Sequence, residues 1–275
     1  MAYEHILYAK DAGVATITLN RPERMNAFSD VMIREWAEAL TDARLDRDVR
    51  AVIVTGAGRG FCAGADLKGG MIGESPSRGE SSRSDAPPTP AERRNWLRDG
   101  VHVVPRAVQL LDKPYIAAVN GAAVGAGMDM ASMADIRIAS EHAKFAMSYV
   151  KVGLVPGDGG CYFLPRILGV AKALEMIWTG DFIDAQEALR LGYVSRVVPG
   201  EELMATATAL ARRLAEGPAV AMQLAKRLVY RGLDASWHEA FEEAGQAMAI
   251  AQSTEDAREG PRAFVEARPP KFQGR

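Results

Sequence analysis

Two glycine-rich segments, residues 60–67 and 120–127, each follow an apolar, β-rich run of the chain. The two runs, Ala51–Val54 and Tyr115–Val119, are continuous apolar stretches typical of fully buried strands. A turn at the end of a buried strand is a favoured place for ligand contact in α/β folds. This repeated arrangement therefore favours an α/β core with a binding site at the two turns.

The side chains of both segments are small, so backbone N–H groups there can reach a ligand. A pair of convergent backbone donors is what an oxyanion site needs, because fixed dipoles then meet the negative charge that develops on a carbonyl oxygen. The segments thus indicate carbonyl chemistry.

Composition excludes several classes of partner. The 275 residues are 48% hydrophobic, which is ample for a buried core. A net charge of −2 provides no field that would attract nucleic acid or an anionic membrane. No apolar run approaches the roughly 20 residues of a membrane span, and residues 1–10 lack the pattern of a secretory signal. We expect a cytoplasmic protein without nucleic-acid or membrane partners.

Cysteine and histidine provide no sign of a metal site. Cys62 and Cys161 suit a reducing compartment, and no Cys/His cluster has the spacing of zinc ligands. His5, His102, His142 and His238 show no nucleophile partner at a recognisable spacing. We therefore predict neither a metal nor a histidine-activated nucleophile.

The order of patterns along the chain predicts an α/β core followed by helices. Residues 5–9 and 14–19 read as a hairpin with a four-residue connection, and Ser29 precedes an amphipathic helix pattern that reaches Leu40. Beyond Glu201 strand-like runs disappear. We predict a core over residues 1–200 and a helical region over 201–275.

Residues 69–90 change abruptly in composition, since they are rich in Gly, Ser, Pro and charge and contain almost no apolar side chains. This predicts a flexible loop directly after the first glycine-rich segment. Two interpretations stay open: a mobile lid over the site, or a solvated insertion without a role.

Taken together, the motifs resemble the crotonase (enoyl-CoA hydratase/isomerase) superfamily over nearly the whole chain. The resemblance implies a spiral of repeated β-β-α units, a C-terminal helical region used in trimerisation, and assembly as a homotrimer or a hexamer. It also implies a coenzyme A thioester as substrate, with no prosthetic group. The motifs that carry it are Asn20-Arg21-Pro22 with Asn26-Ala27, residues 61–67, residues 118–121 with 125–127, Ala134-Asp135-Ile136, residues 153–157 and Leu164-Pro165-Arg166.

By alignment of these motifs, the two oxyanion donors are the backbone N–H groups of Ala65 and Ala126. Ala126 stands where the family usually has glycine, and a methyl group is tolerable there because the amide alone is required. A thioester carbonyl held by both donors can become an enolate, the intermediate that the family's reactions share.

The chain departs from the family at the two glutamates of its hydratases. The first position falls on Asp129, whose carboxylate is one methylene shorter; Asp129 is our candidate acid or base, and the alternative is an acid favoured only by the helix dipole. The second falls on Tyr149, a poor base that can orient water or the acyl group, or simply line the acyl pocket.

Asp158, in Pro156-Gly157-Asp158-Gly159-Gly160, is a possible replacement carboxylate. It lies one residue from the position where family isomerases and dehalogenases place an acid. It is either catalytic or the cap of the helix that begins near Gly159. If Asp129 and Asp158 both face the acyl carbons, they can divide acid and base work between them.

Coenzyme A needs cations for its phosphates and a pocket for adenine. The resemblance assigns this role to Arg24 and to residues around the first turn, namely Ala63, Asp66, Leu67 and Lys68. The basic stretch Arg268–Phe272 resembles a family tail that can reach the ligand of a neighbouring subunit.

The predicted function is reversible addition of water to a 2-enoyl-CoA, in acyl-CoA and fatty acid metabolism. Ala65 and Ala126 would polarise the thioester, Asp129 would handle protons, and Asp158 or Tyr149 would assist. The alternatives are an enoyl-CoA isomerase, an acyl-CoA hydrolase or decarboxylase, or a subunit that binds acyl-CoA without turnover.

Overall fold

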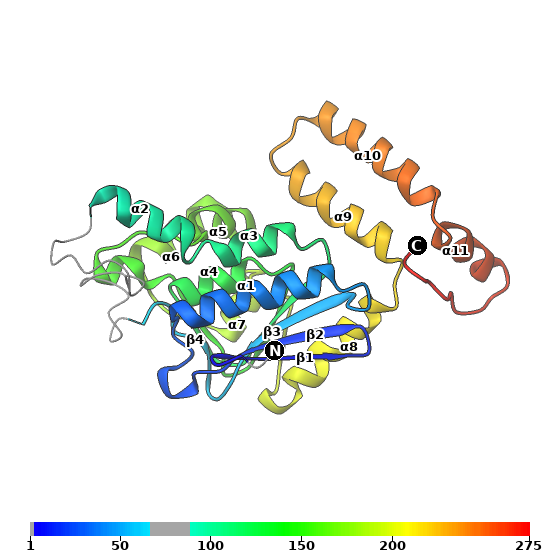
Figure 1. The fold of residues 1–275 in the computed structure, drawn as a ribbon. Helices are drawn as coiled ribbons and strands as arrows, with labels where there is room; N and C mark the ends of the chain where they lie inside the picture. The colour runs from blue at the N-terminus through cyan, green and yellow to red at the C-terminus, as the bar shows by residue number, and fades with distance from the viewer. Residues whose placement is uncertain (1–2, 67–88) are drawn as a thin grey trace.

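Two β-sheets and the helices around them make up the core of the computed structural model, which describes residues 3–66 and 89–275 (Figure 1). The predicted loop and its possible role as a lid, residues 69–90, lie almost wholly outside the described residues. Among the described helices, none is long and apolar enough to span a membrane.

The chain opens with the predicted hairpin, formed by β1 (Ile6–Asp11) and β2 (Val14–Leu19). Its connection is two residues long, not four, because Asp11 pairs with Val14. Ala12 and Gly13 both have positive φ, 46° and 79°, as the tight turn between twisted antiparallel strands requires. The sequence obscured this because Lys10 and Asp11 are polar yet extend the strand.

The larger sheet has the strand order β1-β2-β3-β5-β7-β10 and is parallel apart from β1. Its inner strands β3 (Ala51–Gly56) and β5 (Tyr115–Val119) are almost wholly buried, which explains their continuous apolar runs. The sheet is completed by β7 (Ile136–Ser140) and β10 (Arg196–Val198).

The smaller sheet has the order β4-β6-β8-β9. Its strands are β4 (Gly60–Cys62), β6 (Ala122–Val124), β8 (Lys144–Ala146) and the antiparallel β9 (Ile183–Asp184). The chain thus adds one strand to each sheet in turn, as β3 then β4, β5 then β6, and β7 then β8, with helices between these pairs. This is the predicted spiral of β-β-α units.

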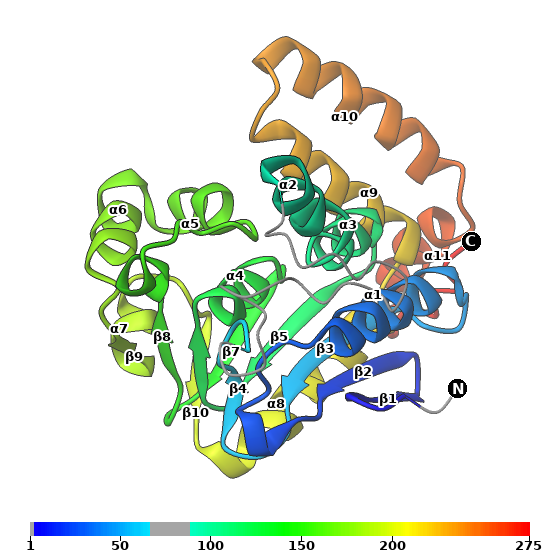
Figure 2. The ribbon, with the colours of Figure 1, turned by 60° about the vertical axis from the view of Figure 1, so that its left-hand side comes forward.

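Helices cover one face of the larger sheet and enclose the main core. The predicted helix is α1 (Asp30–Leu45), and the Ser29 side chain caps it by accepting from Met32 N. Figure 2 shows α4 (Ala126–Ser132) between two helix pairs, α2 (Pro90–Asp99) with α3 (Val103–Leu110), and α5 (Gly160–Leu168) with α6 (Val170–Thr179). The shorter helices are η1 (Pro22–Arg24), η2 (Ser148–Val152), α7 (Ala185–Arg190) and η3 (Gly200–Glu202).

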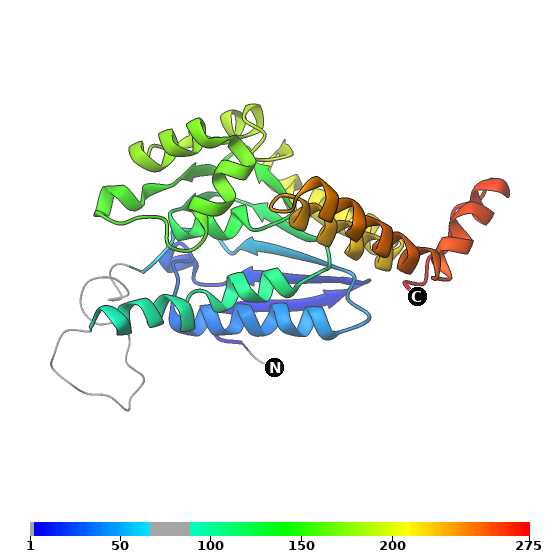
Figure 3. The same ribbon diagram turned by 90° about the horizontal axis from the view of Figure 1, so that it is seen from above.

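The C-terminal helices divide into two groups. α8 (Leu203–Ala215) packs on the opposite face of the larger sheet, where Ala207 and Ala211 lie against Ile53 and Ile116. α9 (Ala219–Gly232), α10 (Trp237–Gln252) and α11 (Asp256–Val265) extend away from the sheets (Figures 1 and 3). Their apolar side chains are largely exposed in the single chain.

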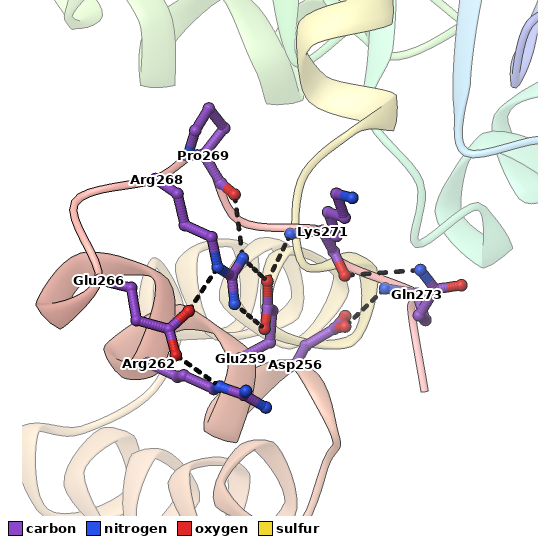
Figure 4. Close-up of polar contacts among 8 residues, drawn as sticks. All are labelled: Asp256, Glu259, Arg262, Glu266, Arg268, Pro269, Lys271 and Gln273. Atoms are coloured by element: carbon purple, nitrogen blue, oxygen red, sulfur yellow. Dashed lines mark hydrogen bonds and ion pairs between the residues drawn. The ribbon is translucent and has the colours of Figure 1, made fainter.

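The tail after α11 is fastened to that helix. Arg268 pairs with both Glu259 and Glu266, and the backbone N–H of Lys271 donates to Glu259 at 2.8 Å (Figure 4). Arg268 and the Lys271 N–H lower the pKa of Glu259 to about 2. The basic stretch therefore begins with an arginine that is already paired with Glu259 of α11 and with Glu266, which directly follows α11.

Candidate active site

The two glycine-rich segments lie side by side because the short strands at their starts are neighbours. β4 and β6 pair in parallel, with Gly60 opposite Ala122 and Cys62 opposite Ala123. The carboxyl ends of neighbouring parallel strands meet at the same edge of a sheet, so the turn that holds Ala65 lies beside the start of α4, which holds Ala126. A Cβ at Gly127 would collide with the carbonyl of Cys62, which shows how close this approach is.

The backbone amides of Ala65 and Ala126 lie on the two sides of this junction, and neither has a backbone hydrogen-bond acceptor among the contacts described below. Ala65 forms a parallel bridge with Phe28, in which Phe28 N donates to Gly64 O at 2.7 Å, so the Ala65 N–H is directed away from Phe28. Ala126 is the first residue of α4, and its N–H therefore has no partner within the helix. Gly64, at φ +88°, lies against it: a Cβ there would be 3.3 Å from Ala126 N.

Two asparagines hold the connection between β3 and β4 in place. Asn26 is fully buried; its amide donates to the carbonyls of Ala57 (2.9 Å) and Gly60 (2.8 Å) and its oxygen accepts from Arg21 N. From the second segment, Asn120 accepts from Gly56 N and donates to Gly58 O at 2.9 Å. Both residues belong to the family motifs, but nothing in the sequence indicates these hydrogen bonds.

Asp129 lies in the first turn of α4 and is fully buried. A Cβ at Gly160 would collide with its Oδ1, so the glycine at the start of α5 makes room for the carboxyl. Asp158, 6% exposed, reaches the same place from the turn before α5. The glycine-rich turn thus brings the two predicted carboxyls together.

Tyr149, in η2, lies between the two carboxyls. Its hydroxyl oxygen is 2.7 Å from Asp129 Oδ2 and 2.9 Å from Asp158 Oδ2. A phenol carries one proton and can donate to only one of these oxygens. The second short contact is favourable when the other carboxyl is protonated and donates to the phenol. The geometry thus fits a cluster with one carboxylic acid, one phenol and one carboxylate.

The electrostatics of the cluster agree with this proton count. Burial raises the pKa of Asp129 to about 7, the charge of Asp158 also raises it, and the hydrogen bond from Tyr149 opposes the rise. Burial raises the pKa of Asp158 too. The pKa of Tyr149 is raised by burial and by both carboxyls, so the phenol stays neutral. Such a cluster can both give and take a proton near neutral pH.

The capping interpretation of Asp158 is wrong. The N-cap of α5 is Gly159, and no side chain caps the helix. The Oδ1 atoms of Asp158 and Asp129 are buried, and neither makes a hydrogen bond of good geometry within the described residues, although the backbone N–H groups of Asp158 and Gly160 lie close enough to Asp129 to lower its pKa. A buried carboxyl oxygen without such a hydrogen bond calls for a functional explanation, since such atoms are costly.

His102, which sequence reasoning dismissed, lies beside this cluster. It directly precedes α3, and its Nε2 is 2.8 Å from Gly157 O and 3.8 Å from Asp158 Oδ1. The spacing of 55 residues between the imidazole and its partner carbonyl carries no local signal. His102, Gly157 and Asp158 all line a groove of about 1240 Å³ that lies between α3, α5 and the C-terminal helices.

The predicted coenzyme A residues are partly described. Arg24 ends η1 and is exposed, and Ala63 is exposed in the first turn. Asp66 is buried, and its Oδ2 is 3.2 Å from Arg21 Nη2. Leu67 and Lys68 lie outside the described residues. Within residues 3–66 and 89–275, no group of three His, Cys, Asp or Glu side chains is arranged to hold a metal ion.

The chain is similar in sequence and in fold to known enzymes that act on acyl-CoA thioesters. The family model for enoyl-CoA hydratase/isomerase matches residues 9–275. The chain is 38% identical to a "Probable enoyl-CoA hydratase" of Mycobacterium bovis, with all of both chains covered. It is 37% identical to the 1,2-epoxyphenylacetyl-CoA isomerase of Escherichia coli K12, with 99% of both covered. A solved enoyl-CoA hydratase from Bacillus anthracis superposes with a TM-score of 0.87 at 33% identity, covering 99% of this chain and 100% of the other.

Proposed function

The chain belongs to the enoyl-CoA hydratase/isomerase family, and on that premise we propose that it adds water reversibly to a 2-enoyl-CoA. One observation supports the proposal: β4 pairs in parallel with β6, and a Cβ on Gly64 would lie 3.3 Å from Ala126 N, so the turn that holds Ala65 lies against the start of α4. Two such donors can bind one thioester oxygen and stabilise the enolate that forms when water adds at C3.

Asp129 and Asp158 divide the proton work in this proposal. Hydration needs one group that takes a proton from water and one that delivers a proton to C2. Both carboxyls contact the Tyr149 hydroxyl, at 2.7 and 2.9 Å. One carboxylic acid and one carboxylate are the acid and the base that hydration requires. Tyr149 is the neutral bridge between them and replaces the second glutamate of the family's hydratases.

A second candidate, migration of the double bond between the 3-enoyl and 2-enoyl thioesters, is favoured by the same bridge. Bond migration removes a proton from C2 and returns one at C4, so it needs an acid and a base but no added water. The Tyr149 phenol lets a proton pass from one carboxyl to the other. The relatives at 38% and 37% identity bear hydratase and isomerase names respectively.

We also propose that Arg24, Ala63, Asp66, Leu67 and Lys68 bind the coenzyme A portion and that the chain forms a homotrimer or a hexamer. Exposed apolar side chains on α9, α10 and α11 support the assembly. The two free thiols, Cys62 and Cys161, support a reducing compartment, which we take to be the cytoplasm.

The test is turnover of crotonyl-CoA, a 3-enoyl-CoA and a malonyl-type thioester by the purified protein, with products identified by mass spectrometry. A 3-hydroxyacyl product supports the hydratase, and a 2-enoyl product from the 3-enoyl substrate supports the isomerase. Asp129→Asn and Asp158→Asn should each lower kcat by about 10²-fold or more. The exposed Asp48→Asn is the matched control. Binding without turnover of any thioester would overturn the proposed function.

A further inference from the structure

The cluster of Asp129, Tyr149 and Asp158 has one protonated carboxyl, and the proposed function does not say which of the two carboxyls it is. We propose that His102 decides this, holding Asp158 as the carboxylate that takes a proton and leaving Asp129 as the acid that returns one. His102 is thus a positioning residue, since it acts through Asp158. The assignment of roles rests on the proposed function, whereas the location of the proton does not.

The hydrogen bond of His102 fixes the sign of its effect. Nε2 lies 2.8 Å from Gly157 O, and a carbonyl oxygen can only accept. Nε2 therefore carries a hydrogen in both the neutral and the charged imidazole. Nε2 lies 3.8 Å from Asp158 Oδ1, so the partial positive charge of this N–H group is close to Asp158 whatever the charge of the ring. A negative charge on Asp158 is favoured in either state.

The backbone N–H groups of Asp158 and Gly160 lower the pKa of Asp129, but by less than burial raises it. Asp129 is fully buried in α4 behind Tyr149, and burial in an apolar environment favours the neutral carboxylic acid. Asp158 borders the groove and His102, whereas Asp129 does not line that groove. The cluster is therefore polarised: Asp129 donates to the phenol oxygen, and the phenol donates to Asp158.

This polarity gives a cycle in which protons balance. In hydration, Asp158 takes a proton from water, and the electron pair of the broken O–H bond forms the new C–O bond. In bond migration, Asp158 takes a proton from C2, and the electron pair of the broken C–H bond forms the dienolate. Asp129 then gives its proton to C2 or C4, respectively. Asp158 now holds a proton and Asp129 is a carboxylate. Tyr149 resets the pair by taking a proton from Asp158 and passing its own to Asp129.

Of the described charged groups around the groove, His102 is the one whose charge lowers the pKa of Asp158. Arg98 pairs with Asp99, and Arg106 Nε donates to the backbone oxygen of His102 at 3.1 Å. Burial raises the pKa of Cys161, and Asp129 is close enough to raise it further. The remaining titratable side chains that line the groove are Arg44, Asp112, Asp135, Tyr162, Lys226, Arg227, Tyr230, Arg231, Asp234, Glu239 and Glu243.

The direct test is ¹³C NMR of the protein labelled at the aspartate carboxyl carbons and titrated between pH 5 and 9, with signals assigned through Asp129→Asn and Asp158→Asn. In the unsubstituted protein at pH 6, below the pKa of Asp129, Asp129 should be the protonated carboxyl and Asp158 the ionised one. In His102→Leu, the titration of Asp158 should move up by about one pH unit. A proton on Asp158 in the unsubstituted protein, or an unmoved titration in the variant, would overturn the proposal.

Kinetics supply the second readout. In His102→Leu the acid limb of kcat/KM against pH should move up by about one pH unit, with a smaller move in His102→Gln, which keeps an N–H for Gly157. His142→Leu changes an exposed histidine and should leave the profile unchanged. An equal fall in rate at every pH would show a merely structural role and overturn the proposal. Lack of turnover by the unsubstituted protein would overturn the proposed function alone, because the NMR titration needs no turnover.

Discussion

Tyr149 changes what the two neighbouring carboxyls can do. The phenol is too weak an acid to ionise here, because burial and two carboxyls raise its pKa. It serves instead as a neutral contact, 2.7 and 2.9 Å from the two oxygens, that couples Asp129 to Asp158. The sequence could identify all three residues as candidates, but it could not show that they meet, because the turn over residues 153–160 sets their approach.

The pKa of Asp129 predicts a pH dependence of stability. The carboxyl has a pKa of about 7 in the folded protein and 3.8 as its ordinary value, so the folded state keeps a proton that the unfolded chain has released. Its contribution is fully present below pH 3.8 and is lost as pH rises towards 7. Between pH 5 and 7, the free energy of unfolding should fall by about 2 kcal/mol relative to Asp129→Asn.

Calorimetric unfolding of both proteins at pH 5, 6, 7 and 8 measures this difference. Asp48→Asn, at an exposed position, is the control and should track the unsubstituted protein at each pH. A constant gap between the unsubstituted protein and Asp129→Asn across this range would contradict the assignment of a raised pKa.

At the scale of elements, the site depends on strands that are too short to predict. β4 and β6 have three residues each and lie inside segments that we interpreted as turns. Their pairing is non-local, and Asn26 and Asn120 fix the connection that leads into β4. By contrast, β3, β5 and α1 were predictable because burial and capping leave local patterns.

Removing the Asn26 side chain should loosen the connection between β3 and β4. Asn26→Ala leaves the carbonyl of Ala57 and the N–H of Arg21 without their partner, whereas the carbonyl of Gly60 keeps the Asn120 amide at 3.2 Å. An orphaned buried polar group costs about 1–3 kcal/mol, so we expect a loss of roughly 3 kcal/mol in the free energy of unfolding, measured in urea. Asn95→Ala, on α2, is the control, with an expected change within about 0.5 kcal/mol. Equal stability of the two variants would refute this role for Asn26.

Fold class and motif order were predictable for the molecule as a whole, since the spiral repeats and the family motifs both leave marks in the sequence. The position of α8 was not, because its pattern resembles that of the helices after it. α8 buries Ala207 and Ala211 on the sheet, whereas Trp237 on α10 is 73% exposed and Phe264 on α11 is 86% exposed. The division into residues 1–200 and 201–275 stays a prediction.

These exposed side chains predict self-association, because monomeric proteins seldom leave large apolar patches in water. Native mass spectrometry should give three or six times the chain mass of 29.6 kDa. Phe264→Glu should shift the protein towards the monomer, while Leu45→Glu, at an exposed position on α1, should not. A monomeric mass for the unsubstituted protein at micromolar concentration would rule out the assembly.

The proposed mechanism depends on two main-chain amides that bind one thioester oxygen. The variant Ala126→Pro tests this most directly. Ala126 is the first residue of α4, the helical position that tolerates proline best, so the substitution deletes one N–H while keeping the helix. Ala126→Gly keeps the amide and serves as the control. With the two variants matched in thermal stability, kcat for enoyl-CoA turnover should be about 10²–10³-fold lower in Ala126→Pro than in Ala126→Gly. Equal turnover in the two variants would contradict the central claim.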